Sequence, residues 1–343
     1  MHEATRADTA DVAVLGAGGA GLWCAREAGL RGRRVVLLDH AEQPGRKILA
    51  SGGGRCNFTN RDAGPSAYVS RNPKFCVSAL ARFPPAEFIA LVEAHGIPYH
   101  EKKLGQLFCD RSARDILDML LAEARAAGAA FLFGARVDGV ARRHGRFELA
   151  TARGTLSAEK LVVATGGRSI ARTGATGFGY ELARQFGHAV IEPEPALVGL
   201  RWSAEDRGRW GDLPGVAVPD AAVTCGGETF REAVLLTHTG LSGPAILQAS
   251  LYWHPGEAVT IDLLPGRDAA AWLRERKTAL PRATLAAALA DVLPGRFAAR
   301  YAELHLPGGT LAHLTTAGLD AAAAALSRWT IHPAGTEGFE KAE

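Results

Sequence analysis

Short apolar runs and a glycine-rich turn near the amino terminus predict a strand, a helix and a second strand. Val12–Leu15 is an uninterrupted apolar run, typical of a parallel strand buried on both faces. Three glycines follow at the spacing G-x-G-x-x-G, and the pattern then predicts a helix over about residues 20–31. Gly32 ends that helix, and Val35–Leu38 is a second buried strand. Residues 11–39 therefore predict a β–α–β unit.

Each glycine of this turn has its own physical role. Gly16 permits the tight turn, Gly18 lets the backbone approach a diphosphate, and Gly21 lets the helix pack against the strand. The helix N-terminus offers free N–H groups and a positive dipole end to phosphates. Asp39 follows Gly21 by 18 positions, near the ~20 expected for an acid that binds ribose hydroxyls.

The turn and Asp39 together predict a bound dinucleotide, either FAD or NAD. NADP is disfavoured because a carboxylate at position 39 would repel a 2′-phosphate. The alternative is a glycine-rich βα turn in an unrelated α/β protein, or in a methyltransferase.

The loop at residues 40–60 combines glycines with positive charge. Gly52–Gly54 form a run without side chains, against which a flat ring or a phosphate could lie. Arg46, Lys47 and Arg55 add positive charge beside it. A flexible surface loop is the alternative. The position directly after Asp39, at the edge where open α/β sheets bind ligands, favours cofactor binding.

The next part of the chain reads as a mostly helical excursion, residues 61–130, followed by a return to the sheet. A strand is expected over Ala130–Arg136 with Val137 at its end. Leu161–Ala164 predicts another buried strand, which ends in Thr165-Gly166-Gly167 and so returns to the ligand edge. A second glycine-rich helix entry at residues 174–179 lacks the G-x-G-x-x-G spacing, so we do not interpret it as a second nucleotide fingerprint.

The composition changes after about residue 190. Short apolar runs separated by turn residues predict a β-rich domain over residues 191–334, with a helical insertion at about 268–327. Residues 1–190 would form the first domain, and residues 335–343 would begin a return to it. The predicted fold class is α/β: a Rossmann-like domain with a central parallel sheet, plus an inserted β-rich, barrel-like domain.

Composition excludes several classes of function. The net charge of +3 is too small to argue for nucleic acid or an anionic membrane surface, so neither partner is expected. No apolar run is long enough to span a membrane, and the polar N-terminus does not resemble a signal peptide. The five cysteines form no C-x-x-C motif, which indicates a reducing cytoplasm and no zinc site or other metal site.

Four motifs together resemble a known family. They are the strand–GAGGAG–helix, GRKILASGGGRCNFTN at 45–60, ATGG at 164–167 and THTGLSGPAIL at 237–247. The chain resembles the BaiN/aminoacetone-oxidase-like FAD-dependent oxidoreductases, which have a glutathione-reductase-type FAD-binding fold. The family returns to its FAD domain with a further glycine-rich segment. This chain ends in FEKAE where that segment would begin, so we expect the C-terminal segment to be lacking.

The resemblance implies an extended FAD and assigns residues to it. The diphosphate would lie on the turn, the ribose on Asp39 and the adenine on the backbone of Val137. The remaining residues would line the diphosphate, the ribityl chain or the returning strand. The full set of implied FAD-binding residues is Gly16, Gly18, Gly19, Ala20, Gly21, Asp39, Arg46, Lys47, Ser51, Gly52, Val137, Thr165 and Gly166.

The resemblance implies an FAD-dependent oxidoreductase that acts on a small organic substrate between two domains, either by enone reduction or by oxidation of an amine or amino ketone. NAD(P)H is a candidate electron donor. The catalytic residue is not assigned, and Cys56 and His238 are the candidates. A non-catalytic FAD- or nucleotide-binding protein and a flavoprotein acting on RNA remain as alternatives. The sequence does not specify the oligomeric state.

Overall fold

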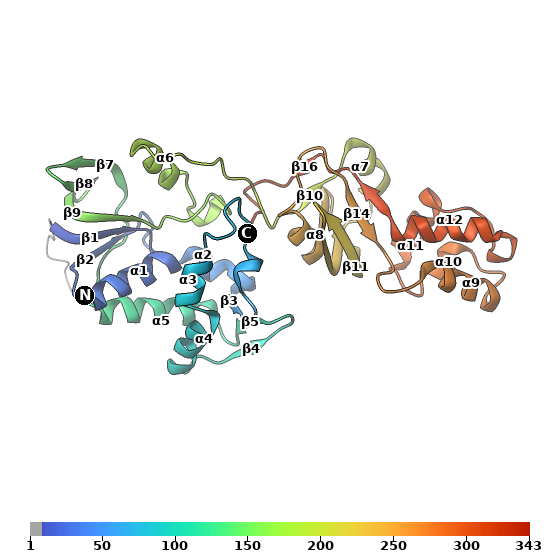
Figure 1. Ribbon diagram of the computed structural model, residues 1–343, viewed down its shortest axis with the longest axis horizontal. Helices are drawn as coiled ribbons and strands as arrows, with labels where there is room; N and C mark the ends of the chain where they lie inside the picture. The colour runs from blue at the N-terminus through green and yellow to red at the C-terminus, as the bar shows by residue number, and fades with distance from the viewer. Residues whose placement is uncertain (1–8) are drawn as a thin grey trace. The chain divides into compact units, whose positions relative to one another are not determined.

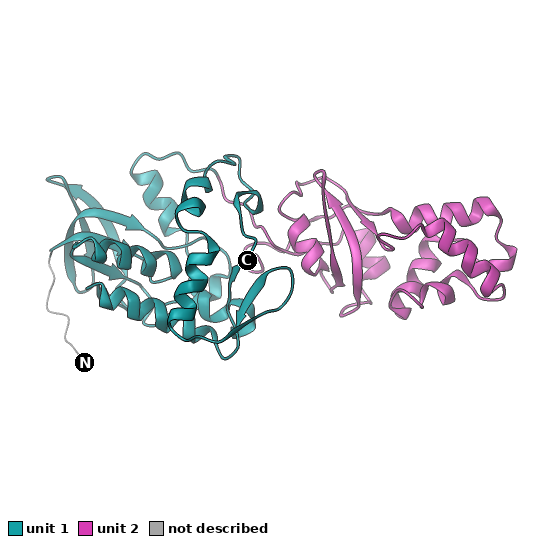
Figure 2. Cartoon of the chain, turned by 60° about the horizontal axis from the view of Figure 1, so that its bottom comes forward, with its two compact units in different colours: residues 1–191 teal, residues 192–343 magenta. Residues whose placement is uncertain are grey.

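The computed structural model describes residues 9–343. Within them the chain forms two compact units that meet between Ile191 and Glu192 (Figure 2). Unit 1 contains the predicted dinucleotide-binding motif, and unit 2 contains most of the antiparallel β structure.

Unit 1 is built on a six-stranded sheet with the order β6-β2-β1-β9-β8-β7. The first four strands in this order are parallel, and β8 and β7 continue the sheet as an antiparallel hairpin. In chain order the strands are β1 (Thr9–Leu15), β2 (Val35–Leu38), β6 (Ala130–Leu132), β7 (Val137–Arg143), β8 (Arg146–Thr151) and β9 (Gly154–Val163).

The apolar runs of β1 and β2 are explained by two cores, one on each face of this sheet. Val14, Leu37 and Val35 belong to one core, and Leu15 and the other β2 side chains belong to the second. Helices α1 (Gly19–Leu30) and α5 (Ala113–Ala126) supply the first core, and α6 (Phe178–Gln185) supplies the second. Figure 1 shows α1 and α5 beside one another below the sheet and α6 above it. A strand covered on both faces has no polar side, so its apolar positions run without interruption.

The remaining part of unit 1 is a small antiparallel sheet with short helices. The sheet has the order β3-β5-β4, with strands β3 (Asn57–Asn60), β4 (Tyr99–Glu101) and β5 (Gln106–Cys109). Three short helices lie before or between these strands: α2 (Arg46–Ala50), α3 (Val77–Arg82) and α4 (Pro85–Ala94). Residues 61–130 are thus helical in large part, with a hairpin around Gly105.

The structure corrects the predicted strand over Ala130–Arg136. β6 ends at Leu132, and Val137 begins β7 instead of ending the incoming strand. Gly134 has a φ of +63°, which turns the chain out of the sheet. The N–H of Gly134 then donates to the carbonyl of Ala41, and the N–H of Ala135 donates to the carbonyl of Asp39. These bonds hold the crossover beside the end of β2.

Unit 2 contains a seven-stranded antiparallel sheet with the order β15-β14-β11-β12-β13-β10-β16. Its strands are β10 (Leu200–Arg201), β11 (Ala217–Cys225), β12 (Glu228–Leu236), β13 (Gly240–Ser242), β14 (Val259–Asp262), β15 (Trp329–Ile331) and β16 (Gly335–Thr336). The last of these, β16, pairs with β10, so residues 335–336 belong to the sheet of unit 2.

Helices complete unit 2 around a single apolar core. Two of them, α7 (Ala204–Trp210) and α8 (Pro244–Ala249), lie in the β-rich part, and α9 (Ala269–Ala279), α10 (Leu285–Leu289), α11 (Gly295–His305) and α12 (Thr316–Ser327) follow β14. Trp210 is fully buried and its ring lies against Phe297 and Trp329, with centroids 5.6 and 5.0 Å away. In the described range, 9–343, no helix has the length and apolarity needed to cross a membrane.

Candidate functional site

The β1–α1 turn shows which glycines are required by packing and which leave space. Gly16 has a φ of +104°, and a Cβ there would lie 2.4 Å from the carbonyl oxygen of Ala164. A Cβ on Gly21 would lie 1.8 Å from the carbonyl oxygen of Gly16. A Cβ on Gly18 or Gly19 would meet no atom within 4 Å. The first two glycines therefore let three backbone segments touch, and the other two border open space.

The N-terminus of α1 faces that open space. Its N-cap residue, Gly18, has an extended backbone and makes no side-chain cap hydrogen bond. The first turn contains no acidic residue. The first N–H groups of a helix have no intrahelical partner, and the helix dipole places partial positive charge on them. This arrangement is suited to an anion such as a diphosphate.

Asp39 lies beside the turn at the carboxyl end of β2. One carboxylate oxygen accepts a hydrogen bond from the N–H of Ala17 at 2.7 Å, and the other accepts from the N–H of Ala41 at 2.8 Å. Nδ1 of His40 lies 3.6 Å from the same carboxylate. The Asp39 side chain is 14% exposed, so a narrow face of it is accessible. Its two backbone donors fix the orientation of the carboxylate, and the predicted ribose contact would use the remaining lone pairs.

Two cavities meet at this carboxylate. The larger, about 470 Å³, extends from β2 toward β7 and α6. The smaller, about 210 Å³, extends from the N-terminus of α1 toward α2. Both are lined by Gly16, Asp39, His40, Thr165 and Gly174, so they form one continuous groove along the carboxyl ends of the strands. This is the edge at which open α/β sheets bind ligands.

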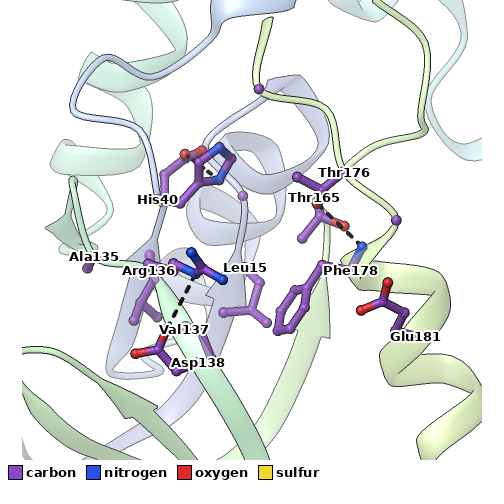
Figure 3. A pocket seen from close by; sticks show the side chains of 15 residues that line it. Leu15, His40, Ala135, Arg136, Val137, Asp138, Thr165, Thr176, Phe178 and Glu181 are labelled. Carbon is purple, nitrogen blue, oxygen red and sulfur yellow. Dashed lines mark hydrogen bonds and ion pairs between the residues drawn. The ribbon is translucent and has the colours of Figure 1, made fainter. Parts of the chain in front are cut away.

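The larger cavity has an apolar floor and charged margins. Figure 3 shows Leu15, Val137 and Phe178 facing the cavity from β1, β7 and α6, respectively. The Arg136 guanidinium is 3.3 Å from the Asp138 carboxylate at one margin. Apolar side chains from three elements around a space of this size suit a flat heteroaromatic ring such as adenine.

The smaller cavity brings cationic groups beside the helix N-terminus. Arg46 and Lys47 line it from α2. The Lys47 ammonium donates to the carbonyl of Gly167 and to the hydroxyl of Ser169, both at 3.0 Å. Burial lowers the pKa of Lys47. Lys47 therefore fastens α2 to the segment after β9, and Arg46 provides a second positive charge next to the open amides.

The two cavities contain most of the predicted FAD-binding residues. Val137 lines the larger cavity, and Gly21 supports the turn from behind. The predicted residues that line the smaller cavity are Gly16, Gly18, Gly19, Ala20, Asp39, Arg46, Lys47, Thr165 and Gly166. The structure thus brings together residues from four separate stretches of the chain.

Ser51 and Gly52 lie outside both cavities. The Ser51 hydroxyl donates to the carbonyl of Ile48 at 2.8 Å. Gly52 has a φ of +56°, and a Cβ there would lie 2.8 Å from the ring of Phe108. The next glycines, Gly53 and Gly54, border open space. The shape of the loop thus depends on Gly52, and the predicted contacts of Ser51 and Gly52 with the cofactor remain predictions.

Neither candidate catalytic side chain lines these cavities. Cys56 is 5% exposed, and burial raises the pKa of its thiol. Burial also raises the pKa of its neighbour Cys109 to about 12. Thiols in such surroundings stay protonated and react slowly. His238 is an exposed residue of unit 2 in the turn between β12 and β13. A catalytic role for either residue stays a prediction.

Several residues that line the two cavities were not predicted from the sequence. His40 follows Asp39 and lines both cavities, and Glu181 lines the larger one. Residues 173–178 form a wall that includes Gly174, Thr176 and Phe178. The sequence feature that could have indicated this wall is the glycine-rich helix entry at residues 174–179. It borders the same groove as the first fingerprint.

These features fit FAD. The open space beside Gly18 and Gly19 suits a diphosphate, and the neighbouring cations offset its charge. The apolar cavity beyond Asp39 has room for the adenine half. No metal is needed to explain the residues that line the groove.

Comparison with known proteins supports the same assignment. Residues 10–305 match the family described as "HI0933-like protein Rossmann domain". A relative from Escherichia coli K12, named ribosomal RNA dihydrouridine synthase, is 46% identical over 97% of this chain and 84% of its own length. A Haemophilus influenzae relative with the same name is 39% identical over 96% of this chain and 83% of its own length.

A more distant relative has a different name. The 3-dehydro-bile acid delta(4,6)-reductase of Clostridium scindens is 29% identical over 85% of this chain and 75% of its own length.

The family match confirms the predicted α/β fold with a Rossmann-like FAD-binding domain, and it confirms the predicted resemblance at the level of the family. The chain belongs to the HI0933-like family, a family of FAD-dependent oxidoreductases with a Rossmann domain.

Proposed function

We propose that this protein is an FAD-dependent reductase that converts a uridine of ribosomal RNA to dihydrouridine. The observation that carries the proposal is the 46% identity, over 97% of the chain, to a protein named for that reaction. The proposal replaces the expected small organic substrate with the RNA alternative. The small net charge, +3, argued against RNA only as a whole-chain average, and a local basic surface is sufficient for binding.

The two reactions named for the relatives share one chemical step. In uridine the C5–C6 double bond is conjugated to the C4 carbonyl, and a 3-dehydro-bile acid with delta(4,6) unsaturation likewise carries double bonds conjugated to a ketone. Reduction adds a hydride to the β carbon and a proton to the α carbon. The π bond is lost, and the substrate gains two electrons and two hydrogens. One family scaffold could therefore serve either substrate, and the substrate pocket would select between them.

The residues of the groove hold the cofactor for this step. The amides at Gly18 and Gly19 would bind the diphosphate, and Asp39 would bind the ribose of the adenosine half. Val137 would contact the adenine. When bound and reduced, FAD supplies the hydride. Lys47 fastens α2 to the segment that follows β9. These bonds maintain the shape of the smaller cavity, in which the diphosphate would lie and which we call the phosphate cavity.

NAD(P)H is the proposed electron donor. The glycine-rich turn at residues 174–179 borders the same groove as the first fingerprint, so it offers no separate dinucleotide site. A nicotinamide would therefore have to reach the flavin without a dinucleotide site of its own. Rapid-mixing absorbance measurements at about 450 nm, where oxidised flavins absorb, would show whether NADH or NADPH bleaches the bound flavin.

The proposal is tested by complementation. The chain would be expressed in an Escherichia coli strain that lacks the relative described above, and dihydrouridine would be measured in purified ribosomal RNA by mass spectrometry. We expect dihydrouridine to return. A flavin-loaded protein that restores none would contradict the proposal.

The second candidate function is reduction of a small conjugated ketone, which the 29% identical bile acid reductase favours. The pre-reduced protein would be mixed with a panel of cyclic enones in the absence of oxygen. Fast flavin reoxidation by an enone, together with failure in the RNA assay, would favour this candidate.

A further inference from the structure

A third cavity in unit 1 lies outside the groove already described. Its volume is about 390 Å³, and it lies between the N-terminal part of α1 and the segment of residues 63–86. Its walls are mostly aromatic or proline side chains. The aromatic residues that line it are Trp23, Phe58, Tyr68, Phe83 and Phe88. Gly19 and Ala20 line both this cavity and the phosphate cavity, so the two are neighbours.

The rings of this cavity pack at angles to one another. The Trp23 and Phe83 centroids are 4.6 Å apart at an interplanar angle of 41°, and those of Phe83 and Phe88 are 6.4 Å apart at 70°. Phe58 lies 6.1 Å from Phe88. Tyr68 lines the cavity from the 63–86 segment and is 49% exposed. The cavity therefore has a fixed aromatic wall and one accessible aromatic side chain at its edge.

The 63–86 segment exposes apolar side chains to an unusual degree. Four of its large apolar residues are exposed, namely Tyr68, Val69, Phe75 and Val77, with Phe75 80% exposed. The Sγ of Cys76 lies 4.0 Å from the carbonyl oxygen of Pro65, so the chain folds back on itself between these two residues. Several exposed apolar side chains on one short segment indicate a binding surface.

All the charged side chains of the same segment are positive. Between Asp62 and Glu87 the sequence contains Arg71, Lys74 and Arg82 and no acidic residue. All three cationic side chains are exposed, and in the part of the chain that the structure describes none of them forms a side-chain hydrogen bond or ion pair. The segment that carries the exposed aromatic residues Tyr68 and Phe75 therefore also carries three cations without a side-chain partner among the described residues.

Single-stranded RNA combines the two chemistries that this surface offers to bind. Its bases stack on aromatic side chains, and its phosphates pair with arginine and lysine. An acidic protein would pair with the cations, but its binding would not explain the aromatic lining of the cavity. A lipid surface would match the exposed apolar residues, but it gives no reason for a concave site lined by aromatic rings.

We propose that the 63–86 segment and the cavity beside it bind the RNA substrate, with one unpaired base in the cavity and phosphates at Arg71, Lys74 and Arg82. The inference rests on the proposed function and adds the surface that selects RNA over a small enone. The contact between the cavity and the phosphate cavity at Gly19 and Ala20 would place this base close to the cofactor.

The charge part is tested by binding of a fluorescent single-stranded RNA of about 20 nucleotides, longer than the roughly 4–16 nucleotides that such sites cover. The triple variant R71Q/K74Q/R82Q removes three phosphate contacts. At about 0.1 M salt we expect its affinity to fall on the order of 100-fold and its log–log salt slope to decrease by about 2. The matched control R33Q/R153Q/K160Q removes the same charge from exposed positions elsewhere in unit 1 and should bind RNA nearly as the wild type does.

The ring part is tested at Tyr68. Y68A should weaken RNA binding by about 5- to 100-fold, and Y68F, which keeps the ring, should bind as the wild type does. Bound FAD is measured in each variant from the flavin absorbance. Loss of FAD in Y68A would mean that the cavity holds part of the cofactor, and this would overturn the proposal. The proposal would also be overturned if both triple variants lost RNA affinity equally, or if R71Q/K74Q/R82Q bound RNA as tightly as the wild type.

The complementation assay separates this inference from the proposed function. If the wild type binds RNA through the 63–86 segment and forms no dihydrouridine, the proposed function fails and the RNA surface stands. If R71Q/K74Q/R82Q restores dihydrouridine to the wild-type level, the RNA surface is wrong and the proposed function stands.

Discussion

Two glycine-to-alanine variants of the same turn should fail in different ways. A Cβ at position 21 would lie 1.8 Å from a backbone carbonyl oxygen, and the two atoms must move apart by more than an ångström. Because both sides are backbone, G21A should destabilise the protein by at least about 1–3 kcal/mol, the usual cost of overpacking. Position 18 borders open space and has an extended backbone that alanine adopts. We therefore expect G18A to change the free energy of unfolding by less than about 1 kcal/mol.

The same G18A variant should lose FAD. If the diphosphate lies against Gly18, the new methyl group overlaps it, and an overpacking cost of about 1–3 kcal/mol corresponds to roughly 5- to 150-fold weaker binding. G308A is the matched control, because a Cβ at position 308 also meets no atom within 4 Å. Urea unfolding of the apoprotein and fluorescence titration with FAD measure the two effects separately. Wild-type FAD affinity in G18A would refute the assignment of the diphosphate to this turn.

Three further outcomes are expected. D39N should bind FAD at least about 10-fold more weakly in fluorescence titration. Both carboxylate oxygens of Asp39 accept a backbone N–H, from Ala17 and Ala41, so an asparagine would turn its NH2 group toward one of these donors and would have fewer lone pairs left for the ribose. K47M should lower the melting temperature measured by circular dichroism, because the carbonyl of Gly167 loses its charged donor. Stability in urea should fall as pH rises above about 9, because the folded state holds the Cys109 thiol protonated up to about 12 whereas the unfolded chain releases its proton near the ordinary pKa. C109A should reduce that fall, and an unchanged pH profile in C109A would contradict this explanation.

The first β–α–β unit could be predicted because its signals are local. An apolar run, three glycines at fixed spacing and an acid at the end of the second strand all fall within residues 11–39. Their roles depend on neighbours in the chain, apart from the contact of Gly16 with Ala164. The structure bears out the separate packing roles of Gly16 and Gly21.

The rest of the groove depends on contacts between distant segments. Val137 was expected at the end of a strand over Ala130–Arg136, but β6 ends at Leu132 and hydrogen bonds to Ala41 and Asp39 hold the next residues outside the sheet. Residues 173–178 line the groove without the G-x-G-x-x-G spacing, so the motif alone does not identify them. A local pattern cannot encode either arrangement.

The aromatic cavity could not be predicted from the sequence, because its rings come from distant segments of the chain. Trp23 belongs to α1, Phe58 to β3 and Phe88 to α4, and each alone is an ordinary core residue. The absence of acidic residues between Asp62 and Glu87 was readable from the sequence. It was lost in the whole-chain net charge of +3.

The close backbone contacts among Gly16, Gly21 and Ala164 have a consequence for how the protein binds its flavin. These contacts are made between protein atoms alone, so the shape of the seat for the diphosphate does not depend on a ligand atom. Little conformational entropy is then left to lose on binding. Flavin analogues that keep the diphosphate and the adenosine half, and differ only in the isoalloxazine, should therefore still bind to this seat in the stripped protein.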